Sequence, residues 1–167
     1  AEYPEISLRI AGSGNLESQL RRRVRDLKLG NQVHFLGWLS PESARKEMQD
    51  ATLLMAPSRV IEGQNLVVTE AFSVGCPVIC TPSGGLTDLV EDGVTGAHIH
   101  ELTPAGIARS VAKSLQNPEK RATLSANAFE RFTREFSRAR IVQQTRLLYS
   151  ETATSAPRYG SVGRAIL

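Results

Sequence analysis

The sequence predicts an α/β protein built on a doubly wound parallel sheet. Short apolar runs of strand length alternate with segments whose apolar residues repeat at helical spacing, which is the pattern of a parallel sheet. The connections between the expected strands are long enough to form right-handed crossovers. The 167 residues suffice for one domain with a hydrophobic core and hardly for two.

Composition and charge narrow the class of protein. Apolar residues make up 41% of the chain and charged residues 22%, which indicates a globular protein. We expect a cytoplasmic location, because no apolar run has the length of a membrane span and no signal-peptide pattern opens the chain. A net charge of +3 suits an anionic ligand, and we expect no nucleic-acid partner. Cys76 and Cys80 are predicted to be buried, reduced thiols.

The first expected strand spans residues 6–11 and ends in the turn Gly12-Ser13-Gly14. Asn15 is expected to cap the following helix, which should run until Gly30-Asn31 stops it. The turn could hold a phosphate under the helix N-terminus, or it could be an ordinary tight strand–helix connection. It lacks the third glycine of a dinucleotide-binding fingerprint, because Glu17 stands there.

The second expected strand, residues 33–36, ends in Gly37-Trp38. Ser40-Pro41 should begin a helix that ends near residue 50, and residues 52–56 should form a third strand. Trp38 follows a strand end, so it could line a nucleobase site or be a partly buried packing residue.

The second half of the chain continues the alternation. We expect strands at 77–80 and 97–100, a short helix at 87–91, and helices at 104–116, at 118–134 and after Ser137. His98 and His100 are predicted to be structural, and no clustered ligand pattern indicates a metal. The composition shifts from Thr152 onward, so we place a domain at 1–151 and a tail at 152–167.

The stretch from Pro57 to Gly96 carries the densest set of functional signals. Glu62 and Glu70 flank seven residues, and an apolar run from Leu66 to Val74 carries the second glutamate. In an open α/β sheet, ligands bind on the loops outside the carboxyl ends of the strands. We therefore predict the site here.

Residues 5–150 resemble the C-terminal half of retaining glycosyltransferases with the GT-B architecture, family 4-like. The motifs that carry the resemblance are, in order, Gly12-Ser13-Gly14, Val33-x-Phe35-x-Gly37, Pro57-Ser58, Glu62-Gly63, Leu66-Val67-Val68-x-Glu70-Ala71, Gly75-Cys76-Pro77-Val78-Ile79, Gly84-Gly85, Asp92-Gly93-x-x-Gly96 and Phe136-Ser137. The resemblance implies a Rossmann-like domain that binds a nucleotide-diphospho-sugar.

The same resemblance implies an activity for the full-length protein. It implies retaining transfer of a hexose from a UDP-, GDP- or ADP-sugar to an acceptor held by an N-terminal half that this chain lacks. No cofactor and no metal are implied, the full-length protein could associate peripherally with a membrane, and the isolated half is expected to be inactive. Because the chain starts with Ala1 and enters a strand almost at once, we expect it to be a piece of a longer protein.

The resemblance also implies roles for the two glutamates. On one helix, eight residues would separate them by about 12 Å, which is the scale of a ribose-to-hexose distance. Glu70 would accept from the ribose hydroxyls, and Glu62, the expected catalytic residue, would face the hexose. Backbone N–H groups of Asn65, Leu66 and Val67 would face the diphosphate. The full expected donor-binding set is Gly12, Gly14, Gly37, Glu62, Gly63, Gln64, Asn65, Leu66, Val67 and Glu70.

Several alternatives stay open at this point. The glutamates could be a helix-cap and surface pair, and Gln64-Asn65 stands where the family often has Phe-Gly. A GT-B sugar-nucleotide epimerase or phosphorylase-like enzyme shares the fold. A non-catalytic nucleotide-sugar-binding or interaction domain is another alternative. A flavodoxin-like or dinucleotide-binding module is disfavoured by the absent third glycine.

Overall fold

The computed structural model describes residues 6–61 and 63–155. Its strands are β1 (Leu8–Ala11), β2 (Val33–Gly37), β3 (Leu54–Ala56), β4 (Val78–Cys80) and β5 (Ala97–His98). Its helices are α1 (Glu17–Asp26), α2 (Pro41–Asp50), α3 (Leu66–Ser73), α4 (Gly85–Leu89), α5 (Pro104–Leu115), α6 (Pro118–Arg131), the π-helix η1 (Phe132–Phe136) and α7 (Arg138–Ser155).

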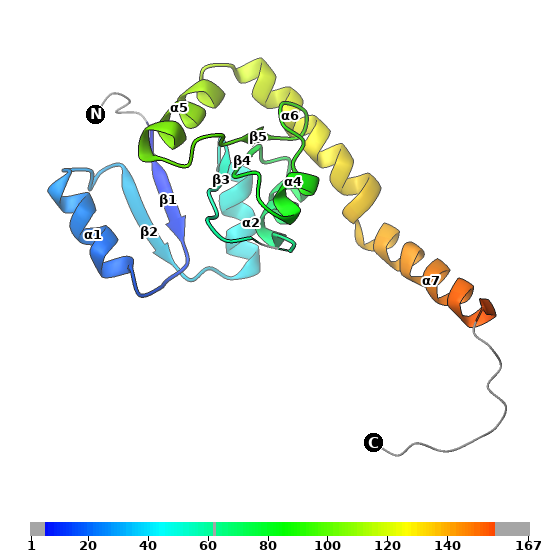
Figure 1. Ribbon diagram of the computed structural model, residues 1–167. Coiled ribbons are helices and arrows are strands. Elements are labelled where there is room, and N and C mark those ends of the chain that lie inside the picture. Colours follow the sequence, from blue (N-terminus) through cyan, green and yellow to red (C-terminus); the bar gives the residue numbers. More distant parts are fainter. Residues whose placement is uncertain (1–5, 62, 156–167) are drawn as a thin grey trace, which may run out of the picture.

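The predicted α/β alternation with parallel pairing is confirmed (Figure 1). All three strand pairs, β1–β2, β3–β4 and β4–β5, are parallel. The expectation of one continuous sheet is wrong, because the hydrogen bonds make a two-stranded sheet, β1–β2, and a three-stranded sheet, β3–β4–β5. Figure 1 shows β1 on the side of β2 that is nearer to β3.

The hydrophobic core lies where α3 packs on the three-stranded sheet. Val68 and Phe72 of α3 have no exposed surface, and they belong to one buried cluster with Val78 and Cys80 of β4. Ile79 points to the other side of β4, because side chains alternate along a strand, and it too is buried. A strand buried on both faces is typical of parallel sheets covered by helices on both sides.

Three helices start with a polar cap residue followed by proline, and the first of these starts, Ser40-Pro41, was predicted. The side chains of Ser40, Thr103 and Asn117 accept hydrogen bonds from backbone N–H groups in the first turns of α2, α5 and α6, and proline follows each cap. Asn15 does not cap α1 as expected. Leu16 is the N-cap residue, and the N–H of Glu17 donates to the carbonyl of Gly14 instead.

The C-terminus of α1 also differs from the prediction. The helix ends at Asp26, before Gly30-Asn31, and Lys28 adopts a left-handed conformation with φ of 55°. The N–H of Leu29 donates to the carbonyl of Val24, and the N–H of Lys28 donates to that of Arg25. This is a Schellman motif, in which the left-handed position is usually glycine.

The last helix leaves the body of the protein. Figure 1 shows α7 projecting beyond α6, and every residue of α7 from 138 to 152 is exposed. Helix α7 continues to Ser155, past the boundary expected at Thr152, and residues 156–167 of the expected tail lie outside the described residues.

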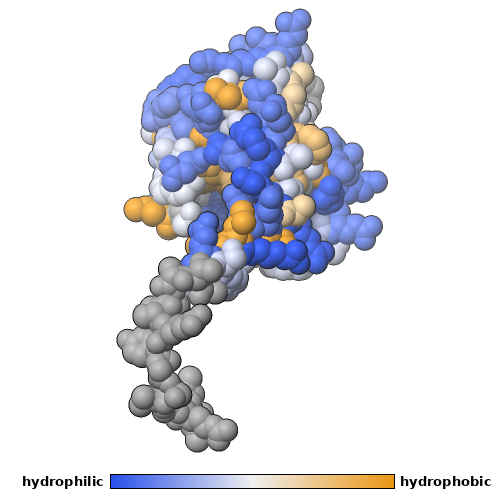
Figure 2. Space-filling model, turned by 90° about the vertical axis from the view of Figure 1, so that its right-hand side faces the viewer, coloured by the Kyte–Doolittle hydropathy of each residue, from blue (hydrophilic) through white to orange (hydrophobic). Residues whose placement is uncertain are grey.

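The face seen in Figure 2 is largely hydrophilic with small, separate hydrophobic patches.

Lys28 gives a stability test. A non-glycine residue in the left-handed region costs about 1–2 kcal/mol, so Lys28→Gly should raise the free energy of unfolding by about 1 kcal/mol. Arg25→Gly is the matched control, and it should lower that free energy by about 1 kcal/mol because glycine weakens a helix. Urea unfolding followed by circular dichroism measures both, and equal losses would contradict the C-cap assignment.

The two cysteines give a second test. Both thiols are free and buried, as predicted. Burial raises the pKa of Cys76 and Cys80 from 9.0 to about 11. Native alkylation at pH 8 should therefore be on the order of 100-fold slower than in urea. Equal native and unfolded alkylation rates would show that the thiols are accessible.

The same raised pKa values predict how stability depends on pH. The free energy of unfolding that the neutral thiols contribute is complete below about pH 9 and is lost between about pH 9 and 11.

Candidate functional site

The loop after β3 is anchored to the end of β4. The hydroxyl of Thr81 donates to the carbonyl of Ser58 at 2.6 Å, and the N–H of Thr81 donates to the carbonyl of Ala56 at 3.3 Å. Thr81 is 5% exposed, so both bonds are shielded from water. The carboxyl ends of β3 and β4 are thereby held together at the edge where parallel sheets bind ligands.

The N-terminus of α3 follows that loop. Asn65 is the N-cap, and its side-chain oxygen accepts from the N–H of Val68 at 3.3 Å. The N–H groups of Leu66 and Val67, in the first turn, have no acceptor within the helix. Asn65, whose N–H the sequence analysis expects to face the diphosphate, is therefore also the cap residue of the helix. Two N–H donors without an acceptor among the described residues and the positive end of the helix dipole therefore meet at this point.

Glu70 lies on the same face of α3 as the side chains of Leu66 and Val67, whereas the N–H groups of these two residues point along the helix axis out of its N-terminus. It is three residues after Val67 and four after Leu66, which is the spacing of neighbours on a helix surface. All three residues are exposed, whereas Val68 and Thr69 between them are buried. Among the described residues no hydrogen bond or ion pair engages the Glu70 carboxylate. Along the helix axis, Glu70 thus lies about 4.5 Å from Val67 and about 6 Å from Leu66, the two residues whose N–H groups have no acceptor in the helix.

The glycine turns after β1 and β2 form a second part of this edge. Gly12 and Gly37 both have positive φ, of 106° and 66°. The N–H of Gly12 donates to the carbonyl of Gly37 at 2.7 Å. An added Cβ at Gly12, Gly14 or Gly37 would meet no atom within 4 Å. The turns are therefore open on their outer side, where a ligand could approach the backbone.

Large apolar side chains are exposed around this edge. Trp38, which follows β2, is 85% exposed, so the interpretation of it as a partly buried packing residue is wrong. Four further exposed apolar residues belong to the β3–α3 loop and the first turn of α3: Val60, Ile61, Leu66 and Val67. Where exposed apolar residues form one contiguous patch, that patch marks a surface that binds a ligand or another part of a protein.

The remaining predicted residues lie in the same connection. Gly63 and Gln64 are exposed, and Glu62 lies outside the described residues. Sequence reasoning missed Thr81, whose role depends on a contact across 23 residues. It also missed Arg59, an exposed cation in the loop after β3. No spacing rule could have found the Thr81 contact, because it exists only once β3 and β4 pair.

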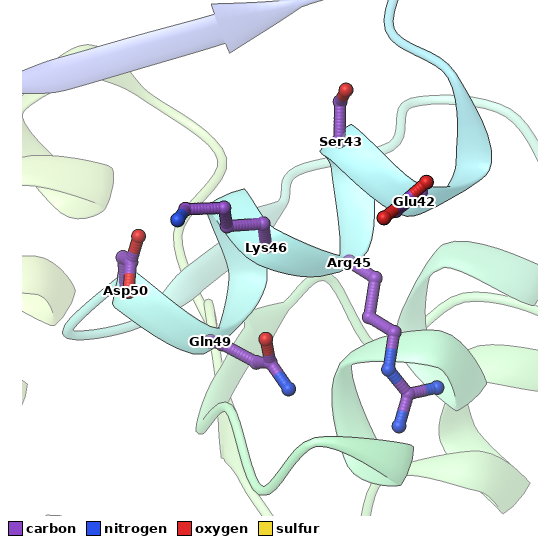
Figure 3. A pocket seen from close by; sticks show the side chains of 6 residues that line it. All are labelled: Glu42, Ser43, Arg45, Lys46, Gln49 and Asp50. Atoms are coloured by element: carbon purple, nitrogen blue, oxygen red, sulfur yellow. The ribbon is translucent and has the colours of Figure 1, made fainter.

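Two hollows on the surface lie elsewhere. The first, of about 370 Å³, follows the outer side of α2, and Figure 3 shows that all six lining side chains come from that one helix. It is a depression between side chains of a single helix. The second, of about 180 Å³, lies between β5, α5 and α6 and includes His98, His100 and Lys113. Neither hollow contains a residue of the predicted donor-binding set.

Two further properties concern the described part of the chain. No group of three or more His, Cys, Asp or Glu residues comes together there in a way that could hold a metal ion. None of its helices is both long enough and apolar enough to cross a membrane.

Comparison with known proteins shows which family these features resemble. Residues 1–131 match the family described as "Glycosyl transferases group 1". The chain is 29% identical over 147 residues to an uncharacterized glycosyltransferase of Methanocaldococcus jannaschii, covering 88% of this chain and 41% of that protein. It is 33% identical over 125 residues to D-inositol 3-phosphate glycosyltransferase 1 of Catenulispora acidiphila, covering 71% and 29%. The chain thus spans less than half of each of these relatives.

Solved structures share the fold. The Anabaena protein HepE in complex with UDP-glucose superposes with a TM-score of 0.80 at 26% identity, covering 89% of this chain and 42% of HepE. A sucrose-phosphate synthase of Thermosynechococcus elongatus superposes with a TM-score of 0.78 at 26% identity, covering 90% and 39%. The expected α/β fold of the GT-B class is therefore confirmed.

The Thr81 anchor can be tested by two substitutions. Thr81→Val keeps the shape of the side chain but removes the hydroxyl that donates to the Ser58 carbonyl, so the free energy of unfolding should fall by about 1–3 kcal/mol. Thr81→Ser keeps the hydroxyl and should recover at least half of that loss. Urea unfolding measures both variants. A valine variant as stable as the serine variant would show that the hydrogen bond contributes nothing.

Proposed function

The chain belongs to the glycosyl transferases group 1 family, and we propose that it forms the donor-binding half of a retaining hexosyltransferase. The observation that carries the proposal is the start of α3, where the N–H groups of Leu66 and Val67 and the carboxylate of Glu70 have no partner among the described residues. These are the groups that a nucleotide-diphospho-sugar requires, namely donors for the diphosphate and an acceptor for hydroxyls. HepE, which was crystallised with UDP-glucose, supports the proposal as a structural neighbour.

The diphosphate would lie over the first turn of α3. The N–H groups of Leu66 and Val67 would donate to its oxygens, and the helix dipole favours a negative charge there. The exposed guanidinium of Arg59 in the preceding loop adds positive charge to the same edge. The open turns at Gly12, Gly14 and Gly37 would let the donor approach the backbone.

The two glutamates would then bind different parts of the donor. Glu70 lies one turn into α3, so its carboxylate would accept from the two ribose hydroxyls. Glu62, before the helix, would accept from hydroxyls of the hexose, and Gly63, Gln64 and Asn65 would line the connection between the two positions. A carboxylate is suited to vicinal hydroxyls because its two oxygens accept paired hydrogen bonds.

The chemistry would be displacement of the nucleoside diphosphate with retention at the anomeric carbon. In an oxocarbenium-like transition state, negative charge grows on the leaving diphosphate while the sugar becomes positive. The N–H groups of Leu66 and Val67 bind the growing negative charge, and Glu62 stabilises the positive sugar. Both contributions increase along the reaction, so they accelerate it and do not only tighten binding.

The acceptor would bind to another part of the full-length protein. The chain spans 41% and 38% of its two relatives in Methanocaldococcus jannaschii, and its candidate site is an open edge rimmed by exposed apolar residues. An acceptor-binding half would cover this edge, so the 167 residues alone would bind donor but not transfer sugar. A cytoplasmic location, with peripheral membrane association of the full-length protein, belongs to the same proposal.

The only tryptophan in the sequence, Trp38, offers a direct readout of nucleotide binding. It lies on the loop after Gly37 at the same edge as the α3 N-terminus, and it is 85% exposed. A base stacking on or near the indole should quench its fluorescence. Titrating the chain with UDP, GDP and ADP would then rank the bases.

Exchange of each glutamate for glutamine tests the division of roles in the full-length enzyme. Glu70→Gln replaces a charged acceptor of the ribose hydroxyls, and charged hydrogen bonds contribute about 1.5–3 kcal/mol. Affinity for free nucleoside diphosphate should therefore fall on the order of tenfold or more. Glu62→Gln should leave that affinity near wild type and lower the rate of transfer sharply.

Calorimetric titration with nucleoside diphosphate and a separate transfer assay give the two quantities. Equal losses of nucleotide affinity in both variants would show that the two glutamates do not bind different parts of the donor. If nucleotide binding and sugar transfer are unchanged in both variants, the two glutamates have no role in the site and are a helix-cap and surface pair.

A further inference from the structure

The hollow between β5, α5 and α6, here called the α5–α6 hollow, gathers cations that have no carboxylate partner. Three of the residues that line it carry a permanent positive charge, namely Lys113, Lys120 and Arg121. No ion pair in the described part of the chain includes any of the three. Like charges that share one hollow repel each other, and an anion bound there would remove that repulsion.

The fold itself directs these cations into the hollow. On α5, Lys113 follows Ser110 by three residues. On α6, Leu124 follows Lys120 by four residues and Arg121 by three, and these are the spacings of neighbours on one helix face. Leu124 is buried, so this face of α6 is fixed against the rest of the protein. Figure 1 shows β5 beside the two helices, and all five side chains line the hollow between the three elements.

The start of α6 opposes the usual electrostatics of a helix. The N-terminus of a helix is positive, which favours acidic side chains in the first turn and disfavours cations. Lys120 and Arg121 nevertheless stand third and fourth in this helix, which begins at Pro118. Glu119, the acidic residue of the first turn, does not line the hollow. Where residues oppose a local rule in this way, a functional or strained site is expected.

Arg121 is held in place by uncharged groups. Its Nη1 donates to the carbonyl of Ser114 at 3.0 Å and also to the carbonyl of Leu115. Both carbonyls belong to the last turn of α5, so the guanidinium is fixed between the end of α5 and the start of α6. Its Nε and Nη2 have no acceptor among the described residues. Arg121 therefore keeps its full charge and donors that an oxyanion could use.

The acidic and hydroxyl groups of the hollow are engaged with other partners. Asp92 is the one carboxylate that lines it. Its Oδ1 accepts from the backbone N–H of His98 at 2.8 Å, and its Oδ2 lies 3.4 Å from Nε2 of His100. The hydroxyls of Ser110 and Ser114 donate to carbonyls of their own helix. The positive charge of the two helices is therefore not paired with an acid inside the hollow.

We propose that the α5–α6 hollow binds a small anion of the phosphate class, held by the ammonium groups of Lys113 and Lys120 and the guanidinium of Arg121. The volume of about 180 Å³ equals the liquid volume of about six waters at about 30 Å³ each. It lies below the roughly 300–1,000 Å³ of pockets for drug-sized ligands. The hollow therefore accepts inorganic phosphate or the phosphoryl group of a small monoester, and it is too small for a nucleotide-diphospho-sugar.

A bound anion would join α5 to α6, because Lys113 belongs to one helix and Lys120 to the other. The unfolded chain does not hold these cations together, so phosphate should raise the melting temperature of the 167-residue chain. At about ten times the dissociation constant the rise should be about 3–6 °C. Sodium chloride at equal ionic strength is the control, because salt alone also weakens repulsion. An equal rise with chloride would overturn the proposal.

Two matched double variants test which cations hold the anion. Lys113→Gln combined with Lys120→Gln should lower the affinity for inorganic phosphate at least about tenfold, measured by titration calorimetry. Arg45→Gln combined with Lys46→Gln removes the same charge from the hollow along α2, and it should change that affinity less than about twofold. Equal losses in the two variants would mean that phosphate responds only to net charge, which would overturn the proposal.

The single variant Lys120→Gln separates binding from a structural role. It removes a cation from the positive end of a helix, so without phosphate its melting temperature should equal or exceed that of the unaltered chain. The rise that phosphate produces should shrink by at least about half. A lower melting temperature without phosphate, together with an unchanged rise, would show that Lys120 is structural and would overturn its assignment.

Amide resonances in NMR spectra locate the bound phosphate and separate this site from the proposed donor site. Addition of inorganic phosphate should shift the amides of Gly93, Asn117 and Lys120, which line the hollow. Shifts of Leu66 and Val67 alone would place the phosphate at the donor edge and overturn the hollow as a site, while leaving the proposed function intact. Shifts around the hollow support the site whether or not the donor edge responds. A hexose monophosphate that binds more tightly than inorganic phosphate identifies a monoester as the ligand, and weaker binding identifies the free ion.

Discussion

The packing of α3 on β4 fixes the geometry of the candidate site. Val68 and Phe72 have no exposed surface against Val78 and Cys80, so the rotation of α3 about its axis is set by its apolar side. Burying those side chains turns the opposite side outward, with Glu70 on it, while the first-turn N–H groups point along the axis out of the N-terminus. A core constraint that depends only on apolar contact therefore decides which polar groups meet a ligand.

The start of the loop that leads into α3 is held by hydrogen bonds to the end of β4. Thr81 bonds the carbonyls of Ser58 and Ala56, so the end of β4 positions the end of β3 and the start of the loop. Such an anchor matters for a site built from backbone donors, because these donors cannot adjust by changing rotamer. The N-terminal unit β1–α1–β2 has no comparable core, and the Arg9–Glu47 pair links it to α2 through exposed charges.

Local sequence rules worked where the determinant is local. The caps at Ser40, Thr103 and Asn117, each followed by proline, were predictable because capping involves residues three apart. The same rules failed at α1. The N-cap was expected at Asn15 and is Leu16, and the stop expected at Gly30 is a left-handed Lys28. At the start of α1 a backbone hydrogen bond takes the place of the expected Asn15 side-chain cap. At its end, backbone hydrogen bonds around Lys28 take the place of the expected glycine stop.

The sequence by itself determined the α/β class, the order of the elements and the family resemblance, because these follow from periodicity and from ordered motifs along the chain. It also indicated that Leu66, Val67 and Glu70 belong to one helix, since three- and four-residue spacings share a face. Only the tertiary structure decided that Trp38 is exposed, that Thr81 anchors Ser58, and that the strands form two sheets. These properties depend on which segments meet in space, and contacts across tens of residues leave no periodic signal in a single sequence.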